Sequence, residues 1–217
     1  MRKISFALTI LIAFGFSALQ AQISDKIVPH MGFMLEYPQA YVPGTNDASG
    51  SLPSYYSFNI GAYMALAQKN DIISVGPQAN LQLGGNFIPL NNRLRFAYHF
   101  QVPVYAMVRV GANSTPYNQQ AVGLAVGLGG SFNALSYYDR LTGGIIGNSR
   151  INYFNPAAVV EIHISTRGQE LILRGHTSLL RDVGVFPQHR DLNGDLLPVQ
   201  PGAQDLGYIG IGVVSSL

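Results

Sequence analysis

The sequence predicts an all-β fold, an eight-stranded antiparallel up-and-down transmembrane β-barrel, from three observations. Only 11% of the 217 residues are charged, whereas soluble domains carry about 25%, so the chain has too few charges to cover a water-facing surface. After the N-terminal segment, no run of about 18 apolar residues indicates a membrane helix. Apolar residues instead recur at every second position, and in hydrocarbon only helices and closed barrels satisfy every backbone polar group.

The first 21 residues are expected to be a cleaved secretory signal peptide. Arg2 and Lys3 precede an apolar run from Ile4 to Phe16, and small and polar residues follow, which is the layout of such signals. The apolar run is shorter than the roughly 20 residues of a spanning helix, which argues against an uncleaved anchor. We expect cleavage after Ala21, so that residues 22–217 form a single outer-membrane β-barrel domain.

The charge balance and the absence of cysteine restrict the class of protein further. Without the two basic residues of the signal, 11 Lys and Arg face 11 Asp and Glu. A chain near neutrality gives no sign of a nucleic-acid partner. With no cysteine, an exported chain must be stabilised by its own topology, which favours a closed barrel over a small secreted module.

Period-two alternation marks the eight expected strands, since successive side chains of a strand point to opposite faces. They are residues 30–37, 55–67, 72–84, 93–111, 121–134, 156–166, 170–180 and 206–217. On the first four strands the apolar face is expected to hold Met31, Phe33, Leu35 and Tyr37; Tyr56, Phe58, Ile60, Ala62, Met64 and Leu66; Ile73, Val75, Pro77, Ala79, Leu81 and Leu83; and Leu94, Phe96, Tyr98, Phe100, Val102, Val104, Ala106, Val108 and Val110. On the last four it is expected to hold Val122, Leu124, Val126 and Leu128; Val160, Ile162 and Ile164; Leu171, Leu173 and Leu179; and Ile209, Ile211, Val213 and Leu217.

The composition of the intervening positions decides which face is outside. They are mostly Gly, Ser, Ala, Asn and Gln with a few charges, which are too small and too neutral for a water-facing exterior. Such residues suit the crowded interior of a small barrel. We therefore expect the apolar face to contact lipid and the polar face to fill the lumen, in preference to a soluble lipocalin-like barrel with an apolar interior.

The expected connections agree with a barrel whose N- and C-termini both lie in the periplasm. They are expected at 38–54, 68–71, 85–92, 111–120, 135–155, 167–169 and 181–205. Outer-membrane barrels have short periplasmic turns and longer outer loops, so the first, third, fifth and seventh connections are expected outside. The fourth strand is longer than the 9–11 residues or so that cross a bilayer, so either it projects beyond the membrane or Pro103 marks a bulge.

Several segments resemble a known family. "FQVPVYAMVRV" (Phe100–Val110), "ISVGPQANLQLG" (Ile73–Gly84) and "VGLAVGLGGSF" (Val122–Phe132) are similar to strands of the outer-membrane β-barrel domain family, which is OmpA/OmpX-like in size and includes PorT-like proteins. The resemblance implies eight antiparallel strands in the cell outer membrane. It also implies contact with outer-membrane lipids and lipopolysaccharide, and with the barrel-assembly machinery during biogenesis. It implies no single activity, and the chain departs from the family by ending in Leu217 rather than an aromatic residue.

Ionisable residues share the lumen-facing parity. A charge in a narrow lumen must be paired, because unpaired burial is very costly. We expect Arg95 or Arg109 to pair with one of the two carboxylates, Glu36 and Glu161, so that the network plugs the lumen and fixes the register rather than conducting. The residues expected in this lumen polar network are Glu36, Arg95, His99, Arg109, Glu161, His163 and Arg174.

Two patterns raise other kinds of chemistry. Glu161, His163 and Ser165 provide the groups of an acyl-transfer triad, and the His-x-Ser pair is similar to that of lipid A deacylases, but alternate residues of one strand make poor triad geometry. "DLNGD" begins at Asp191 like a calcium loop, but the sixth and twelfth positions do not fit, and a polar hairpin is the simpler interpretation. We therefore expect no catalytic residue, no metal and no cofactor.

Aromatic residues near the expected strand ends or on lipid-facing strands are candidates for interfacial girdles. These candidates are Tyr37, Tyr41, Tyr55, Tyr56, Tyr98, Tyr153, Phe154 and Tyr208. The sequence as a whole favours a structural or interaction role, with a filled lumen and four surface loops. A transport- or secretion-associated barrel is the first alternative and a lipid A-modifying enzyme the second. The sequence identifies no extracellular or periplasmic protein partner.

Overall fold

The computed structural model describes residues 26–41, 48–90, 93–140, 146–166, 169–185, 188–190 and 204–216. Their strands are β1 (Ile27–Tyr41), β2 (Ala48–Ser51), β3 (Tyr55–Met64), β4 (Ala67–Lys69), β5 (Ile73–Leu90), β6 (Arg93–Gly111), β7 (Val122–Arg140), β8 (Ile146–Thr166), β9 (Gln169–Ser178), β10 (Asp182–Val185), β11 (Gln188–Arg190) and β12 (Gln204–Ser216). No helix among these residues is long and apolar enough to cross a membrane.

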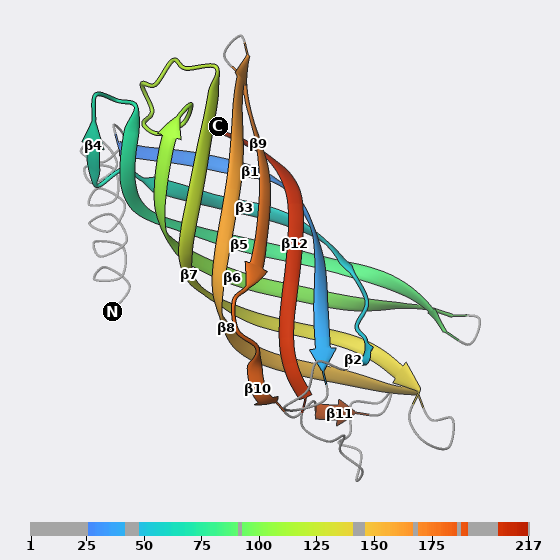
Figure 1. The fold of residues 1–217 in the computed structure, drawn as a ribbon. Coiled ribbons are helices and arrows are strands. Elements are labelled where there is room, and N and C mark those ends of the chain that lie inside the picture. Colours follow the sequence, from blue (N-terminus) through green and yellow to red (C-terminus); the bar gives the residue numbers. More distant parts are fainter. Residues whose placement is uncertain are drawn as a thin grey trace, which may run out of the picture.

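Eight of the strands close into a ring. Successive long strands pair antiparallel in the order β1, β3, β5, β6, β7, β8, β9 and β12, and β12 pairs back with β1. In Figure 1, β7, β8, β9 and β12 run steeply across β1, β3, β5 and β6 behind them, as tilted strands do in a barrel. The predicted eight-stranded antiparallel up-and-down barrel is therefore confirmed, with β2, β4, β10 and β11 as short additions at its ends.

Both described chain ends lie at one end of the barrel, because Met31 near the start of β1 pairs with Ser215 near the end of β12. We call this the terminal end. β3 and β6 end there and continue through residues 65–72 and 112–121, and β8 ends there as β9 begins. β1, β5, β7 and β9 have their last residues at the opposite end. The sequence placed short turns and long loops on these same sides.

The side chains follow the predicted faces. Outward positions carry large apolar residues such as Phe33, Leu128 and Ile211, all more than half exposed, whereas inward positions are largely polar and buried. This distribution inverts that of a soluble protein, in which the apolar residues fill the interior. The prediction that the apolar face is the outer face is confirmed.

The strands at the opposite end are longer than the sequence predicted. β7 has 19 residues and β8 has 21, so most of the expected 135–155 connection is a continuation of this hairpin. Here the alternation inverts: Leu135 and Ile151 face inward and are buried, whereas Arg150 and Asn152 are exposed. A strand that leaves the hydrocarbon meets water on its outer face, so its apolar residues turn to the interior, and a search for lipid-facing alternation misses the extension. The 85–92 connection is likewise mostly strand.

The long fourth strand of the ring has no bulge at Pro103. β6 has 19 residues, and its register with β5 is the same before and after Pro103, since Ala79 pairs with Val104 and Gln82 with Gln101. The pairing is interrupted only beside Pro103, which has no N–H to donate.

Candidate functional site: the ionic lumen

Glu161 is the centre of the lumen. It lies on β8, is fully buried, and accepts hydrogen bonds from four side chains. Arg174 Nε lies 2.7 Å from Oε1 and Gln78 Nε2 lies 2.9 Å from the same oxygen. Arg109 Nη2 lies 3.3 Å from Oε2 and His163 Nε2 lies 3.0 Å from it. Charge-assisted bonds of this kind are what make a buried carboxylate tolerable.

The strand register explains how the two arginines reach one carboxylate. Arg174 on β9 is directly opposite Glu161. Arg109 on β6 is two strands away, and the residue between them in the register is Ala125 on β7. Because the methyl group of Ala125 is short, the Arg109 side chain can pass over β7 and meet the carboxylate.

The cluster extends to the neighbouring strands through both guanidinium groups. Arg174 Nη1 donates to Asn80 Oδ1 at 2.9 Å and Arg174 Nη2 lies 3.0 Å from His30 Nε2. The Arg109 guanidinium carbon lies 4.0 Å from the centroid of the Tyr63 ring, a cation–π contact. Together these contacts link β1, β3, β5, β6, β8 and β9 across the barrel interior.

A second buried pair, a carboxylate and an imidazole, lies nearer the opposite end and follows the same construction. Glu36 Oε1 lies 2.8 Å from His176 Nε2, and His176 Nδ1 lies 3.1 Å from the hydroxyl of Tyr105. Glu36 on β1 and His176 on β9 are separated in the register by Gly210 on β12. A Cβ atom at Gly210 would overlap both partners of the pair, so the missing side chain is what lets them meet.

The structure brings together most, but not all, of the residues expected in the network. Of the expected pairs, Arg109–Glu161 forms, and Arg174 and His163 join the same carboxylate. The partner of Glu36 is His176 rather than an arginine. Arg95 is half-buried, and no hydrogen bond or ion pair joins it to another described residue.

The remaining expected residue, His99, is buried near the second pair. Its Nδ1 lies 3.5 Å from Ser57 Oγ, and its ring lies 5.3 Å from that of Tyr55. Three residues of the Glu161 cluster were not singled out from sequence: Gln78, Asn80 and His30. Their lumen-facing parity is readable from the alternation, but amides and imidazoles at that parity are common in this chain, so parity alone does not select them.

The terminal end of the lumen is closed by the connection after β6. Residues 112–115 are buried, and the turn begins with positive φ at Gly111 (81°) and Asn113 (61°). Arg109 Nη1 donates to the carbonyl of Asn113 at 3.2 Å, and Ser74 Oγ donates to the carbonyl of Ser114. This connection, longer than a usual turn at its end of the barrel, therefore folds over the mouth beside the Glu161 cluster.

Near the opposite end, the interior is closed by aromatic and aliphatic side chains. Tyr55, Tyr153 and Tyr208 point inward and are buried together with Leu135 and Ile151. The interpretation of these three tyrosines as girdle residues is wrong, because each lies on the lumen parity of its strand. Of the other candidates, Tyr37, Tyr56, Tyr98 and Phe154 are exposed on the outer face, and half-buried Tyr41 has Arg181 stacked 3.4 Å from its ring centroid.

A closed antiparallel sheet with an apolar exterior and a filled, ionic interior is the structure expected of a protein whose outer surface is surrounded by the hydrocarbon of a bilayer. The chain folds as a small transmembrane β-barrel of the outer-membrane type. Its outer wall presents apolar residues, and its backbone polar groups pair around the ring.

No protein-family model and no curated protein matches the sequence. Neisserial surface protein A (NspA) is a structural match with 13% identity and a TM-score of 0.45, covering 87% of this chain and 97% of that chain. Ail, the attachment invasion locus protein of Yersinia pestis, matches with 8% identity and a TM-score of 0.45, covering 89% and 99%. The outer membrane protease OmpT from Escherichia coli matches with 11% identity and a TM-score of 0.39, covering 89% and 97%. Likeness at this level says nothing about the activity, ligands or partners of this barrel.

The two alternative kinds of site have different outcomes. Glu161 and His163 of the considered triad are hydrogen-bonded, but Nδ1 of His163 has no partner and no hydrogen bond joins His163 to Ser165 within the described residues. Asp191, Asn193 and Asp195 of the considered calcium loop lie outside the described residues. Among the residues that are described, no group of three or more His, Asp or Glu side chains is placed to hold a metal ion.

Proposed function

We propose that this outer-membrane barrel is a plugged, non-conducting scaffold with a structural or interaction role, which presents four connections at the cell surface. The observation that carries the proposal is the continuous filling of the lumen. Going from the terminal end, it is occupied by residues 112–115, by the Glu161 cluster, by the Glu36–His176 pair and by the tyrosine layer around Tyr208.

The charge balance of the lumen supports a plug rather than a pore. Glu36, Glu161, Arg109 and Arg174 are all buried. The two arginines are charged at every accessible pH and both lie against Glu161, whereas Glu36 lies against His176. A conducting barrel keeps its charged residues hydrated along a water-filled channel, whereas an eight-stranded barrel has room only for side chains. Paired, buried charges link the strands from inside and oppose sliding of their register.

Conductance tests the plug directly. The purified barrel is reconstituted into planar bilayers beside a general porin as the positive control, and current is recorded at fixed voltages. We expect no discrete current steps from the barrel under conditions in which the porin gives them. Discrete steps from the barrel would contradict the plug and would support the transport- or secretion-associated alternative.

The outer connections test the role. A strain that lacks the protein is complemented with the full chain or with a chain in which residues 191–203 are replaced by a short Gly-Ser linker. Restored resistance to detergent with both chains would indicate a structural role of the barrel wall. Restoration with the full chain alone would assign the role to the surface connection, and thus to an interaction. Normal resistance in the strain that lacks the protein would contradict a structural role.

A further inference from the structure

The outer wall of the barrel has one uncovered glycine among those whose surroundings are described. Two outward glycines are covered by aromatic rings: Phe96 lies over Gly85, and Phe154 lies over Gly130. Such rings shield the bare backbone of a strand. Gly175 on β9 has no atom within 4 Å of the position of its missing Cβ, so its backbone is open to the hydrocarbon.

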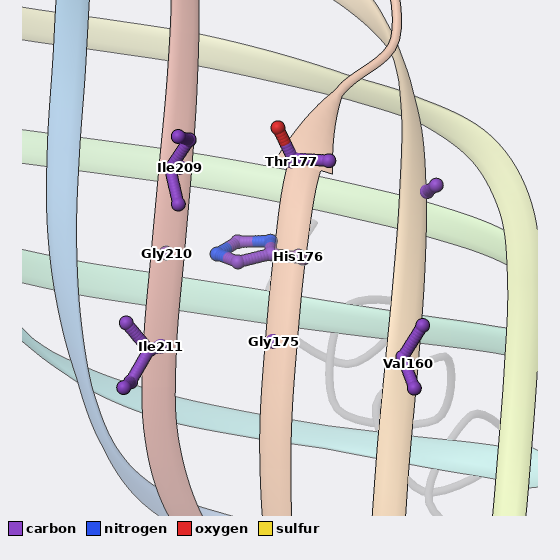
Figure 2. A pocket seen from close by; sticks show the side chains of 8 residues that line it. Val160, Gly175, His176, Thr177, Ile209, Gly210 and Ile211 are labelled. Carbon is purple, nitrogen blue, oxygen red and sulfur yellow. The ribbon is translucent and has the colours of Figure 1, made fainter.

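This bare backbone is the floor of a groove between two ridges. Val160 on β8 and Ile211 on β12 are the register partners of Gly175, and both are more than half exposed. Figure 2 shows their side chains on either side of β9, with nothing at Gly175 between them. Two overlapping depressions, of about 370 and 390 Å³, share these three residues.

The groove runs along β9 from Leu173 to Thr177. At a rise of about 3.3 Å per residue, four residues along the strand correspond to roughly 13 Å. The residues that close its sides are β-branched or otherwise apolar, namely Ala158, Ile162, Ile209 and Val213. The groove is thus a narrow slot as deep as one missing side chain.

No polar group in the slot is available to a ligand. Thr177 Oγ1 already donates to the backbone carbonyl of Tyr208 at 3.1 Å. The imidazole of His176 belongs to the lumen, where Nε2 lies 2.8 Å from Glu36 and Nδ1 lies 3.1 Å from Tyr105. The lining therefore selects a linear apolar group and offers nothing to a headgroup or a charged partner.

We propose that this β8–β9–β12 groove binds one acyl chain of a membrane lipid. The groove opens on the lipid-facing wall, so acyl chains surround it at high concentration, and a slot one side chain deep fits a single chain laid along β9. A second copy of the barrel fits less well, because two convex walls touch along a line and bury little of the roughly 1,200–2,000 Å² that specific interfaces need.

Tryptophan quenching tests the proposal, because the natural chain has no Trp. Two single-Trp reporters are made: Val213→Trp in the side wall of the groove, and Leu83→Trp on β5, which is four strands from β9 in the ring. Each is reconstituted into bilayers with increasing fractions of lipid brominated on its acyl chains, with glycine or leucine at position 175. We expect quenching of the Val213→Trp reporter to saturate at a lower brominated fraction than that of the Leu83→Trp reporter. Gly175→Leu should remove this difference and leave the Leu83→Trp reporter unchanged.

The other outcomes overturn the proposal. Equal curves for the two reporters, whatever residue stands at 175, would mean that acyl chains contact the groove no more than the rest of the wall. A Val213→Trp reporter that is protected from quenching, and loses this protection on Gly175→Leu, would mean that a second copy covers the groove.

The variants should fold, so a change in quenching reports on the groove and not on misfolding. Gly175 has no positive φ and has open space at its Cβ, so Gly175→Leu should fold, as heat-modifiability on a gel will show. Val160→Ala provides a second variant that lowers one ridge and fills nothing. It should also reduce the preference of the Val213→Trp reporter for brominated lipid, and an unchanged preference in both variants would overturn the assignment to this groove.

Discussion

Replacing Glu161 by glutamine should destabilise the barrel more than any other single change of one carboxylate. The variant keeps the size of the side chain but removes the negative charge that faces Arg109 and Arg174, at 3.3 and 2.7 Å. Both arginine side chains are fully buried, so neither can move its charge into water. Removing one partner of a buried ion pair costs about 3–5 kcal/mol, and we expect a loss of about this size in the free energy of unfolding.

Urea unfolding of the barrel in detergent micelles measures this loss, with the folded fraction read from the gel mobility of unheated samples. Glu36→Gln is the matched control. Its partner His176 carries no obligatory charge, unlike an arginine, so this variant should lose only about 1–3 kcal/mol, as for a buried group left without its hydrogen bond. Combining Glu161→Gln with Arg109→Met and Arg174→Met should recover most of the loss, because no charge is then left unpaired. A loss below about 1 kcal/mol for Glu161→Gln would refute the view that Glu161 holds the lumen together.

Three further predictions concern the small residues, the amides and the imidazole of the lumen. Gly210→Ala should separate Glu36 from His176 and lower the free energy of unfolding by about 1–3 kcal/mol. Gly175→Ala is the control and should leave this free energy unchanged, because a Cβ at that position meets open space. Urea titration compares the two variants, and equal effects would contradict the role of Gly210. Asn59 and Gln82 are register partners, and their side-chain amide atoms have no hydrogen-bond partner within the described residues. The double variant Asn59→Leu, Gln82→Met should therefore keep or raise the free energy of unfolding in the same titration. A loss above about 2 kcal/mol would show that bound water satisfies these amides. His163→Ala should leave lipid A unchanged in mass spectra of cells, and an altered acyl pattern would support the enzyme alternative.

The barrel itself could be predicted because its signal is local and repeated. Lipid faces one side of every strand, so each crossing segment shows the same period-two pattern without reference to any other segment. The period-two pattern did not predict strand where one side of the strand no longer faces lipid. In the β7–β8 extension the apolar residues Leu135 and Ile151 face inward, and the rule for lipid-facing strands gave a loop where the chain continues as strand.

The lumen could be predicted as a composition but not as a set of pairs. Parity assigns Arg109, Glu161 and Arg174 to the interior, but it also assigns Arg95 there, and only contacts distinguish the arginine that meets a carboxylate from the one that does not. The aromatic residues show the opposite case: alternation already placed Tyr56 on the lipid-facing parity and Tyr55 on the other one. Their shared position near a strand end made both girdle candidates, and the structure shows that parity, not that position, decides which of them faces lipid.

By itself, the sequence determined that this chain crosses a membrane as a closed sheet and which side chains face lipid, because alternation along a strand is a property of the strand alone. The tertiary structure decided which interior residues meet. Arg109, Ala125, Glu161 and Arg174 come from four strands, and they form one row only because the hydrogen-bond register between neighbouring strands aligns them. The register depends on how all eight strands close into a ring, so the partners of each buried charge are a property of the whole barrel.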